Sequence, residues 1–214
     1  MKAVVLLSGG LDSTTALYWA LEKGYQPVCL SVQYGQRHAR ELRAARAVAR
    51  RARVPLHELQ VPLPWLEGSS LTNRSLRLPD VPLARIGRGG VPSTYVPGRN
   101  TIFLALAASL ADAAGADAIV IGANALDYSG YPDCRGPYLR AFEKAARQGT
   151  RRTRLRVLAP LLKLTKAGIW KLGRKVGAPL ELTWSCYAGG ERPCGRCDSC
   201  KLRQKGYDEA FGQG

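Results

Sequence analysis

The sequence of this 214-residue chain predicts an α/β fold, with a parallel sheet of about five strands and helices on both of its faces. Short apolar runs typical of buried strands recur along the chain. Segments with the character of helices separate them, which gives repeated strand–helix–strand units. The crossovers between parallel strands are then right-handed. We find no internal repeat and no low-complexity linker that would argue for another class.

The predicted elements follow one another regularly. Strands are expected at residues 3–7, 27–32, 55–61, 118–121 and 156–160, and helices at 16–22, about 40–52, about 101–114, about 138–147 and from Thr165, as its cap, to about 176. Residues 62–95 are rich in Pro, Gly, Ser and Arg without a clear period, so we expect a loop with short helical pieces that is mobile until a ligand binds. Ligands of such sheets lie at the carboxyl ends of the strands.

The turn after the first strand has the strongest chemical signal. Its two glycines let the backbone approach a ligand closely, and the N–H groups at a helix start favour an anion. Its hydroxyls and one carboxylate suit a polyphosphate with its metal ion, but the lysine of a Walker loop is absent. A plain turn capped by Asp12 or Ser13 would need neither the glycines nor so many polar groups. The nucleotide-binding stretch is therefore Leu7, Ser8, Gly9, Gly10, Leu11, Asp12, Ser13, Thr14, Thr15, Ala16 and Leu17.

Composition sets broad limits. The net charge of +16 invites a nucleic-acid hypothesis, yet the basic residues are dispersed, and Arg43, Arg46 and Arg50 fall on the solvated face of an amphipathic helix. Most of this charge stays unexplained. No apolar run is long enough to span a membrane. The chain starts with a strand pattern, so we expect no signal peptide and a cytoplasmic location.

Cysteines cluster near the end of the sequence, as Cys186-x7-Cys194-x2-Cys197-x2-Cys200. Four thiolates satisfy tetrahedral zinc, and closed sites of this kind are structural. An iron–sulfur cluster, free thiols or a redox pair are the alternatives. We expect one metal-binding region at residues 181–214, packed on an ATP-binding domain at residues 1–180.

Several motifs together resemble a known family. Ser8-Gly9-Gly10-x-Asp12-Ser13 resembles the PP-loop of ATP pyrophosphatases, which cleave ATP between the α and β phosphates. Between Ser8 and Arg203, the chain is similar to the 7-cyano-7-deazaguanine synthase (QueC) family. The supporting segments are Tyr34-Gly35-Gln36-Arg37-His38, Val96-Pro97-Gly98-Arg99-Asn100, residues 122–135 and Thr183-Trp184-Ser185-Cys186-Tyr187 with the three later cysteines.

The resemblance implies a Rossmann-like, adenine nucleotide α-hydrolase-like fold and an ATP-dependent ligase. The family converts 7-carboxy-7-deazaguanine and ammonia into 7-cyano-7-deazaguanine (preQ0), a precursor of queuosine. It implies one structural Zn²⁺ per chain, ATP as co-substrate, Mg²⁺ and a homodimer. The expected partners are small molecules, without nucleic acid or membrane. Making a nitrile requires two activations, of the carboxylate and then of the amide oxygen, and the loop type favours AMP and pyrophosphate as products.

Site roles follow as hypotheses. Asp12 binds Mg²⁺ or orients the phosphates through it, Ser13 holds phosphate, and Arg99 and Lys166 neutralise developing charge, with Lys163 as the rival of Lys166. Cys134 is expected to be a wall of the site. Either Asp127 or Asp133 accepts the guanine-like N–H pair, and Arg135 holds the substrate carboxylate. The full substrate-binding set is Arg37, His38, Asn124, Asp127, Tyr128, Tyr131, Asp133 and Arg135.

Three other functions remain open at this point. A tRNA-modifying PP-loop thiolase would suit the charge, but it needs a persulfide-forming cysteine or an iron–sulfur centre and usually an RNA-binding domain. A zinc-ribbon nucleic-acid-binding module with an inactive nucleotide fold would not need the intact loop at Ser8–Ser13. A QueC-like enzyme of another deazapurine pathway would have almost the same cleft.

Overall fold

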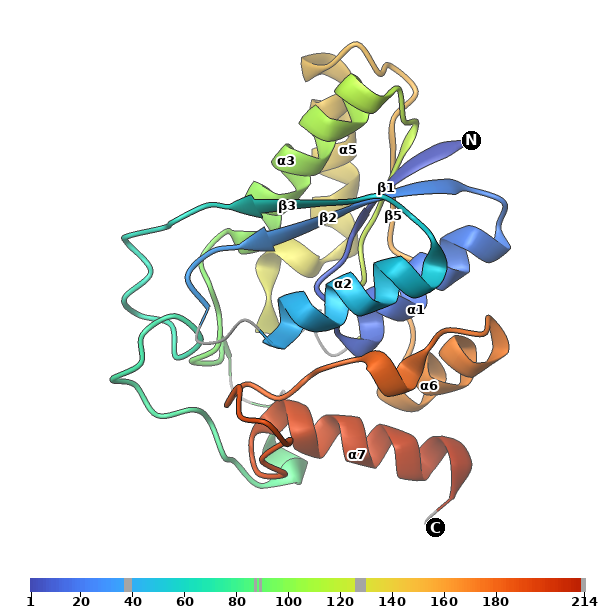
Figure 1. The fold of residues 1–214 in the computed structure, drawn as a ribbon. Coiled ribbons are helices and arrows are strands. Elements are labelled where there is room, and N and C mark those ends of the chain that lie inside the picture. The colour runs from blue at the N-terminus through green and yellow to red at the C-terminus, as the bar shows by residue number, and fades with distance from the viewer. Residues whose placement is uncertain (37–39, 87, 89, 126–129, 213–214) are drawn as a thin grey trace.

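A computed structural model of the chain describes residues 1–36, 40–86, 88, 90–125 and 130–212. The described residues form one parallel sheet of five strands in the order β3-β2-β1-β4-β5 (Figure 1). The strands are β1 (Lys2–Leu6), β2 (Gln26–Gln33), β3 (Leu56–Gln60), β4 (Ala118–Val120) and β5 (Arg156–Leu158). The predicted fold class and its parallel strands are confirmed. The chain winds outward from β1 to β3 and then crosses to β4, so the crevice of the switch point lies beside the end of β1.

Side chains of β1 alternate between two hydrophobic cores. Ala3 and Val5 belong to the core beneath α1, α2 and α6, whereas Val4 and Leu6 belong to the core beneath α3 and α5. This alternation follows from the period of two along a strand. Figure 1 shows α3 and α5 on one side of the sheet and α1 and α2 on the other. The helices are α1 (Leu11–Glu22), α2 (Arg40–Ala52), α3 (Arg99–Ala114), α5 (Gly136–Gly149), α6 (Lys166–Lys175) and α7 (Asp198–Phe211).

Three helices, α1, α3 and α5, begin earlier than the sequence indicated, and one was missed. Helix α1 starts at Leu11 instead of Ala16, with Gly10 as its N-cap. Asp12 therefore lies inside the first helical turn and is not a simple cap. Helix α3 starts at Arg99, and α7 was not predicted at all. In the described ranges, no helix is both long and apolar enough to cross a membrane.

The segment between β3 and α3 is a loop, as its irregular composition predicted, and it also forms a small core that the sequence did not indicate. Leu66 and Val96 pack with Tyr34 in a separate buried cluster. A short 3-10 helix, η1 (Leu83–Arg85), lies within the loop. The ammonium of Lys201 on α7 contacts Asp80 at 2.5 Å, which ties the loop to the C-terminal region. The mobility expected of this loop stays a prediction.

The C-terminal region packs against the crevice end of the sheet. After α6 the chain passes through η3 (Leu180–Leu182), and the N–H of Trp184 donates to the carbonyl of Gly9 at 2.9 Å. Helix α7 lies along α6 (Figure 1), with Trp170 edge-on to the rings of Tyr207 and Phe211. The last part of the chain therefore forms one wall of the crevice.

Gly9 sets the distance between the first loop and α2. Its φ is +83°, and a Cβ at this position would lie 2.5 Å from the carbonyl oxygen of Glu41 and would also overlap the amide nitrogen of Ala45. Both atoms belong to the backbone of a packed helix, which cannot move aside cheaply. The loop can approach α2 this closely only because the position is a glycine.

We expect Gly9→Ala to destabilise the fold by about 3–5 kcal/mol, since it adds a steric clash to the roughly 1–2 kcal/mol cost of a left-handed conformation. Gly24→Ala is the matched control, because Gly24 has a φ of +75° and a Cβ there would meet no atom within 4 Å. Urea unfolding followed by circular dichroism measures both. Equal losses would show that the contact with α2 does not matter.

Candidate active site and metal centre

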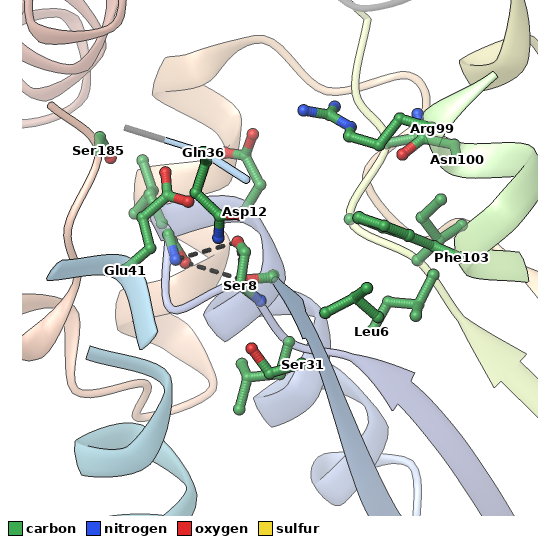
Figure 2. A pocket seen from close by; sticks show the side chains of 18 of the residues that line it. Leu6, Ser8, Asp12, Ser31, Gln36, Glu41, Arg99, Asn100, Phe103 and Ser185 are labelled. Carbon is green, nitrogen blue, oxygen red and sulfur yellow. Dashed lines mark hydrogen bonds between the residues drawn. The ribbon is translucent and has the colours of Figure 1, made fainter. Parts of the chain in front are cut away.

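A cavity of about 280 Å³ opens at the carboxyl ends of β1, β2 and β4. One side is apolar and includes Leu6, Val32 and Phe103. Figure 2 shows Leu6 and Phe103 on that side and polar side chains across from them. The polar lining consists mainly of Ser8, Asp12, Ser13, Gln36, Glu41, Arg99, Lys166, Ser185, Tyr187 and Arg203. The cavity thus combines an apolar surface with a strongly polar end.

The loop after β1 presents the start of α1 to the cavity. Ser13 Oγ lies 3.0 Å from Ser8 Oγ and accepts from the N–H of Ser8 at 3.2 Å, so these hydroxyls shape the loop. The N-cap residue, Gly10, provides no side-chain cap. The N–H of Thr14 donates to the carbonyl of Gly10 at 3.1 Å, which is the first hydrogen bond of the helix. The N–H groups of Leu11, Asp12 and Ser13 precede that bond and lie at the open end of α1. A helix start arranged in this way binds anions.

Asp12 joins three distant segments at the polar end of the cavity. Its Oδ2 accepts from Lys166 Nζ at 2.5 Å and from Asn124 Nδ2 at 2.8 Å. Its Oδ1 is buried and has no hydrogen-bond partner among the described residues. Behind it, a Cβ on Gly122 would lie 3.0 Å from Asp12 C and from Ser13 N, so the chain after β4 touches the first turn of α1. A buried, unpaired carboxylate oxygen suits a cation or a donor from a ligand.

Arg99 faces Asp12 from the other side of the cavity (Figure 2). Its Nη1 donates to the hydroxyl of Tyr34 at 3.3 Å, and its guanidinium lies 5.8 Å from the centre of that ring. Burial raises the pKa of Tyr34, although the charge of Arg99 opposes this shift. The phenol therefore stays neutral and keeps the guanidinium in place without cancelling its charge.

Asp133 holds the start of α3. One carboxylate oxygen accepts the N–H of Asn100 at 2.8 Å, and the other accepts from Asn100 Nδ2 at 3.3 Å. Asn100 Nδ2 also lies 3.0 Å from Cys134 Sγ, and Cys134 lines the cavity. Asp133 is buried and does not line the cavity. In this structure it positions the helix turn that carries Arg99, a role that the sequence did not suggest.

The other predicted residues divide into those that line the cavity, those that lie outside it and those that the structure does not describe. Tyr131 lines the cavity, with its hydroxyl 2.9 Å from Thr94 Oγ1, whereas Lys163 and Arg135 are exposed and lie outside it. From the predicted nucleotide-binding stretch, the cavity is lined by Leu7, Ser8, Gly10, Leu11, Asp12 and Ser13, with Thr14, Thr15, Ala16 and Leu17 buried behind them. Four predicted substrate residues lie outside the described residues: Arg37, His38, Asp127 and Tyr128.

Sequence reasoning missed Glu41 and Arg203 as cavity residues. Glu41 stands in an arginine-rich helix whose pattern indicated only a solvated face. Arg203 lies in a region to which we assigned only a metal. Neither position has a local signal, because each reaches the cavity through packing between helices.

Glu41 is a carboxyl group that folding places in an unfavourable setting. Burial raises its pKa to about 7, although the charge of Arg99 opposes the shift. Among the described residues it has no hydrogen-bond or ion-pair partner, and Figure 2 shows it directed into the same cavity as Asp12. Such a group is typical of a binding site that is completed by its ligand.

The four clustered cysteines meet in space. The sulfur atoms of Cys186, Cys194, Cys197 and Cys200 all lie within 4.8 Å of one another. Tetrahedral zinc with Zn–S bonds of about 2.3 Å separates its sulfurs by about 3.8 Å, so the cluster is close to the required size. The N–H of Cys194 points to Cys186 Sγ at 3.3 Å, and that of Cys197 to Cys194 Sγ at 3.4 Å. The donor set could hold a metal such as zinc.

We expect Cys194→Ser to lose most of its bound metal and to lower the free energy of unfolding by several kcal/mol, because a structural metal contributes directly to folding. Cys29→Ala is the control, since Cys29 is buried in β2 away from the cluster. Metal analysis of the purified proteins and thermal unfolding are the measurements. Full metal content in Cys194→Ser would refute this ligand set.

Glu41→Gln should make the ligand-free protein more stable than the parent, and this advantage should grow as the pH rises. The pKa of this carboxyl is about 7 in the fold and about 4.5 without the fold, so folding is favoured by protonation and loses that contribution between pH 4.5 and 7. The glutamine amide does not ionise, so the variant does not lose this stability as the pH rises. The variant should therefore gain up to about 3 kcal/mol over the parent above pH 8, and little at pH 4.

Thermal unfolding of the variant and the parent at pH 4 and above pH 8 tests the direction of this stability difference. Glu58→Gln is the opposite control, because the hydrogen bond from Arg46 lowers the pKa of Glu58. That variant should lose stability at pH 8, and its deficit should shrink in acid. A difference between Glu41→Gln and the parent that does not change with pH would contradict the unfavourable setting of Glu41.

Comparison with known proteins relates nearly the whole chain to one family. A family model described as "Queuosine biosynthesis protein QueC" matches residues 2–211. The 7-cyano-7-deazaguanine synthase of Gloeothece citriformis is 47% identical over 214 residues, covering 98% of this chain and 92% of that protein. The enzyme of the same name from Thermoplasma acidophilum is 50% identical over 212 residues, covering 98% and 88%.

A likeness to a solved structure concerns the fold alone. The NMN synthetase of Francisella tularensis superposes with a TM-score of 0.54 at 15% identity, covering 100% of this chain and 77% of that one. The match of the family model over nearly all of the sequence, and identities near one half over almost the whole of both chains, go further than the fold. The chain belongs to the QueC family of queuosine biosynthesis proteins.

Proposed function

We propose that this chain is an ATP-dependent ligase that converts 7-carboxy-7-deazaguanine and ammonia into 7-cyano-7-deazaguanine, a queuosine precursor. The observation that carries the proposal is Asp12, whose unpartnered Oδ1 lies in the first turn of α1 while Lys166 pairs with its Oδ2. A helix start, a carboxylate oxygen and a cation at one place suit a polyphosphate with a divalent ion. Relatives about half identical to this chain have this enzyme's name.

ATP would extend from the polar end of the cavity to its apolar side. Its phosphates would bind the N–H groups at the start of α1 and the hydroxyls of Ser8 and Ser13. The purine would lie against the apolar side, where Leu6 and Phe103 offer a dry surface. When bound, Mg²⁺ would be held by Asp12 Oδ1 and would supply charge neutralisation on the phosphates.

The chemistry requires two successive activations at the same carbon, first of a carboxylate oxygen and then of the amide oxygen. An oxygen of the substrate carboxylate attacks the α-phosphorus of ATP, and pyrophosphate leaves. Ammonia then adds to the activated carbonyl carbon and AMP leaves, which gives the amide. A second ATP activates the amide oxygen, and loss of AMP with the remaining N–H protons gives the nitrile. Lys166 and Arg99 line the cavity and would stabilise the negative charge that develops on the phosphates.

The deazaguanine would lie between the loop after β2 and the start of α3. Gln36, Tyr131 and Cys134 line that part of the cavity, and Cys134 would act as a wall. Asn124 would act through Asp12, to which it donates. Arg37, His38, Asp127 and Tyr128 remain predicted substrate contacts.

The four cysteines would hold one Zn²⁺ per chain in a structural role, since four thiolates close a tetrahedral site. We infer a catalytic part at residues 1–180 and a metal-binding part at residues 181–214. The family resemblance favours a homodimer with small-molecule partners in the cytoplasm. A QueC-like role in another deazapurine pathway would make the same nitrile, and the reaction that consumes the nitrile distinguishes the two roles.

The direct test is to incubate the purified protein with ATP, Mg²⁺, ammonia and 7-carboxy-7-deazaguanine and to follow the nitrile by mass spectrometry. The nitrile, with AMP and pyrophosphate, is the expected result. Intact ATP and no nitrile would overturn the proposal. ATP consumption with sulfur incorporated into tRNA would instead support a tRNA-modifying thiolase, which the net charge of +16 favours.

Lys166, at the start of α6, and Lys163, three residues before it, make an informative pair of variants. Lys166→Ala should lower kcat by about 10²–10³, because it removes a cation at the reacting phosphates. Lys163→Ala should change kcat less than about twofold, since Lys163 is exposed and outside the cavity. Asp12→Ala should abolish turnover and retain zinc. Equal losses in both lysine variants would contradict the geometry, and steady-state kinetics with metal analysis distinguishes these results.

A further inference from the structure

Helix α7 carries an arginine, Arg203, into the wall of the cavity. Its Nη1 donates to Ser185 Oγ at 3.0 Å and its Nη2 to the carbonyl of Leu180 at 3.2 Å. The guanidinium lies 4.9 Å from the ring centre of Trp170. Since a guanidinium has five N–H donors in a rigid fork, these two hydrogen bonds fix its plane and leave donors for a ligand.

The charge of Arg203 is poorly compensated within the protein. Burial lowers its pKa, and the negative charge of Asp12 opposes that shift. Within the described part of the chain, no carboxylate lies at ion-pair distance from Arg203, and Asp12 is paired with Lys166. Arg203 is partly buried, and a partly desolvated cation without a paired anion costs stability that an anionic ligand would offset.

The packing of α7 places this cation next to the Lys166 site. A Cβ on Gly206 would lie 2.6 Å from Lys166 Cβ, so α7 touches the first turn of α6 directly. The carbonyl of Arg203 accepts from Trp170 Nε1 at 3.1 Å. One turn before Arg203, Cys200 belongs to the cysteine cluster. Metal ligation would therefore fix the start of the same helix that directs Arg203 and supports Lys166.

We propose that Arg203 is a further phosphate-binding residue, which the C-terminal region supplies to the polyphosphate of ATP beside Lys166 and the loop after β1. This inference rests on the proposed function, because it takes ATP as the ligand of the cavity. It extends the site to a part of the chain whose evident role is structural.

The test is to measure the affinity of Arg203→Gln for ATP, pyrophosphate and adenosine by calorimetry. Charge-assisted hydrogen bonds are the strong ones, so the Kd for ATP and for pyrophosphate should rise about 10- to 100-fold. The Kd for adenosine should change less than about twofold, since the apolar side of the cavity is intact. A merely structural role would weaken adenosine and ATP alike, and that result would overturn the proposal.

Arg174→Gln is the matched control. Arg174 lies 5.1 Å from the ring centre of Phe211 in the same aromatic cluster, but it does not line the cavity. It loses the same charge and a similar ring contact, so its affinity for all three ligands should stay as in the parent.

Three further outcomes separate a failure of the proposed function from a failure of the role of Arg203. A parent protein that binds no ATP would overturn the proposed function itself. A parent that binds ATP, with an Arg203→Gln variant of equal affinity, would overturn only the role of Arg203. Weaker binding of 7-carboxy-7-deazaguanine with unchanged ATP affinity would also overturn it, because Arg203 would then recognise the carboxylate substrate.

Discussion

The site depends on the position of one carboxylate. Asp12 accepts hydrogen bonds from Lys166 at 2.5 Å and from Asn124 at 2.8 Å, so α1, α6 and the segment after β4 meet at its Oδ2. Charge-assisted hydrogen bonds of this length are strong and directional. They also leave Oδ1 buried and, among the described residues, unpaired at the start of α1. The same contacts that join the sheet to its helices thus shape the place where we propose that a cation and phosphates bind.

Close backbone contact is the second requirement of this arrangement. Gly9 brings the first loop against α2, and Gly206 brings α7 against Lys166, at distances that a Cβ would not permit. The buried cluster around the cysteines is small and consists of Ala44, Trp184 and three of the cysteines, so a metal there would add to the limited stability that packing supplies. Through Trp184 and Arg203, that structural centre is in contact with the proposed ATP site.

The cavity holds charges that the protein alone does not balance. Glu41 has a pKa raised by burial to about 7, and Arg203 is a partly buried cation outside any ion pair that the described residues form. Arg99 is held by a neutral phenol and keeps its charge. Such groups cost stability without ligand, which is the usual compromise of sites built for binding. The proposed ligands, a polyphosphate with its divalent ion and a donor-rich purine, would relieve these costs.

The sequence by itself determined the features that depend on neighbouring residues. The alternation of strands and helices, the loop at Ser8–Ser13 and the spacing of the cysteines are local patterns, and the structure confirms the fold that they predicted. Only the tertiary structure decided the sheet order, the existence of α7, the entry of Glu41 and Arg203 into the cavity, and the use of Asp133 to hold Asn100. The reason is physical. Periodicity and spacing act along the chain, whereas the partner of a carboxylate or a guanidinium is chosen by helices that pack together from distant parts of the sequence.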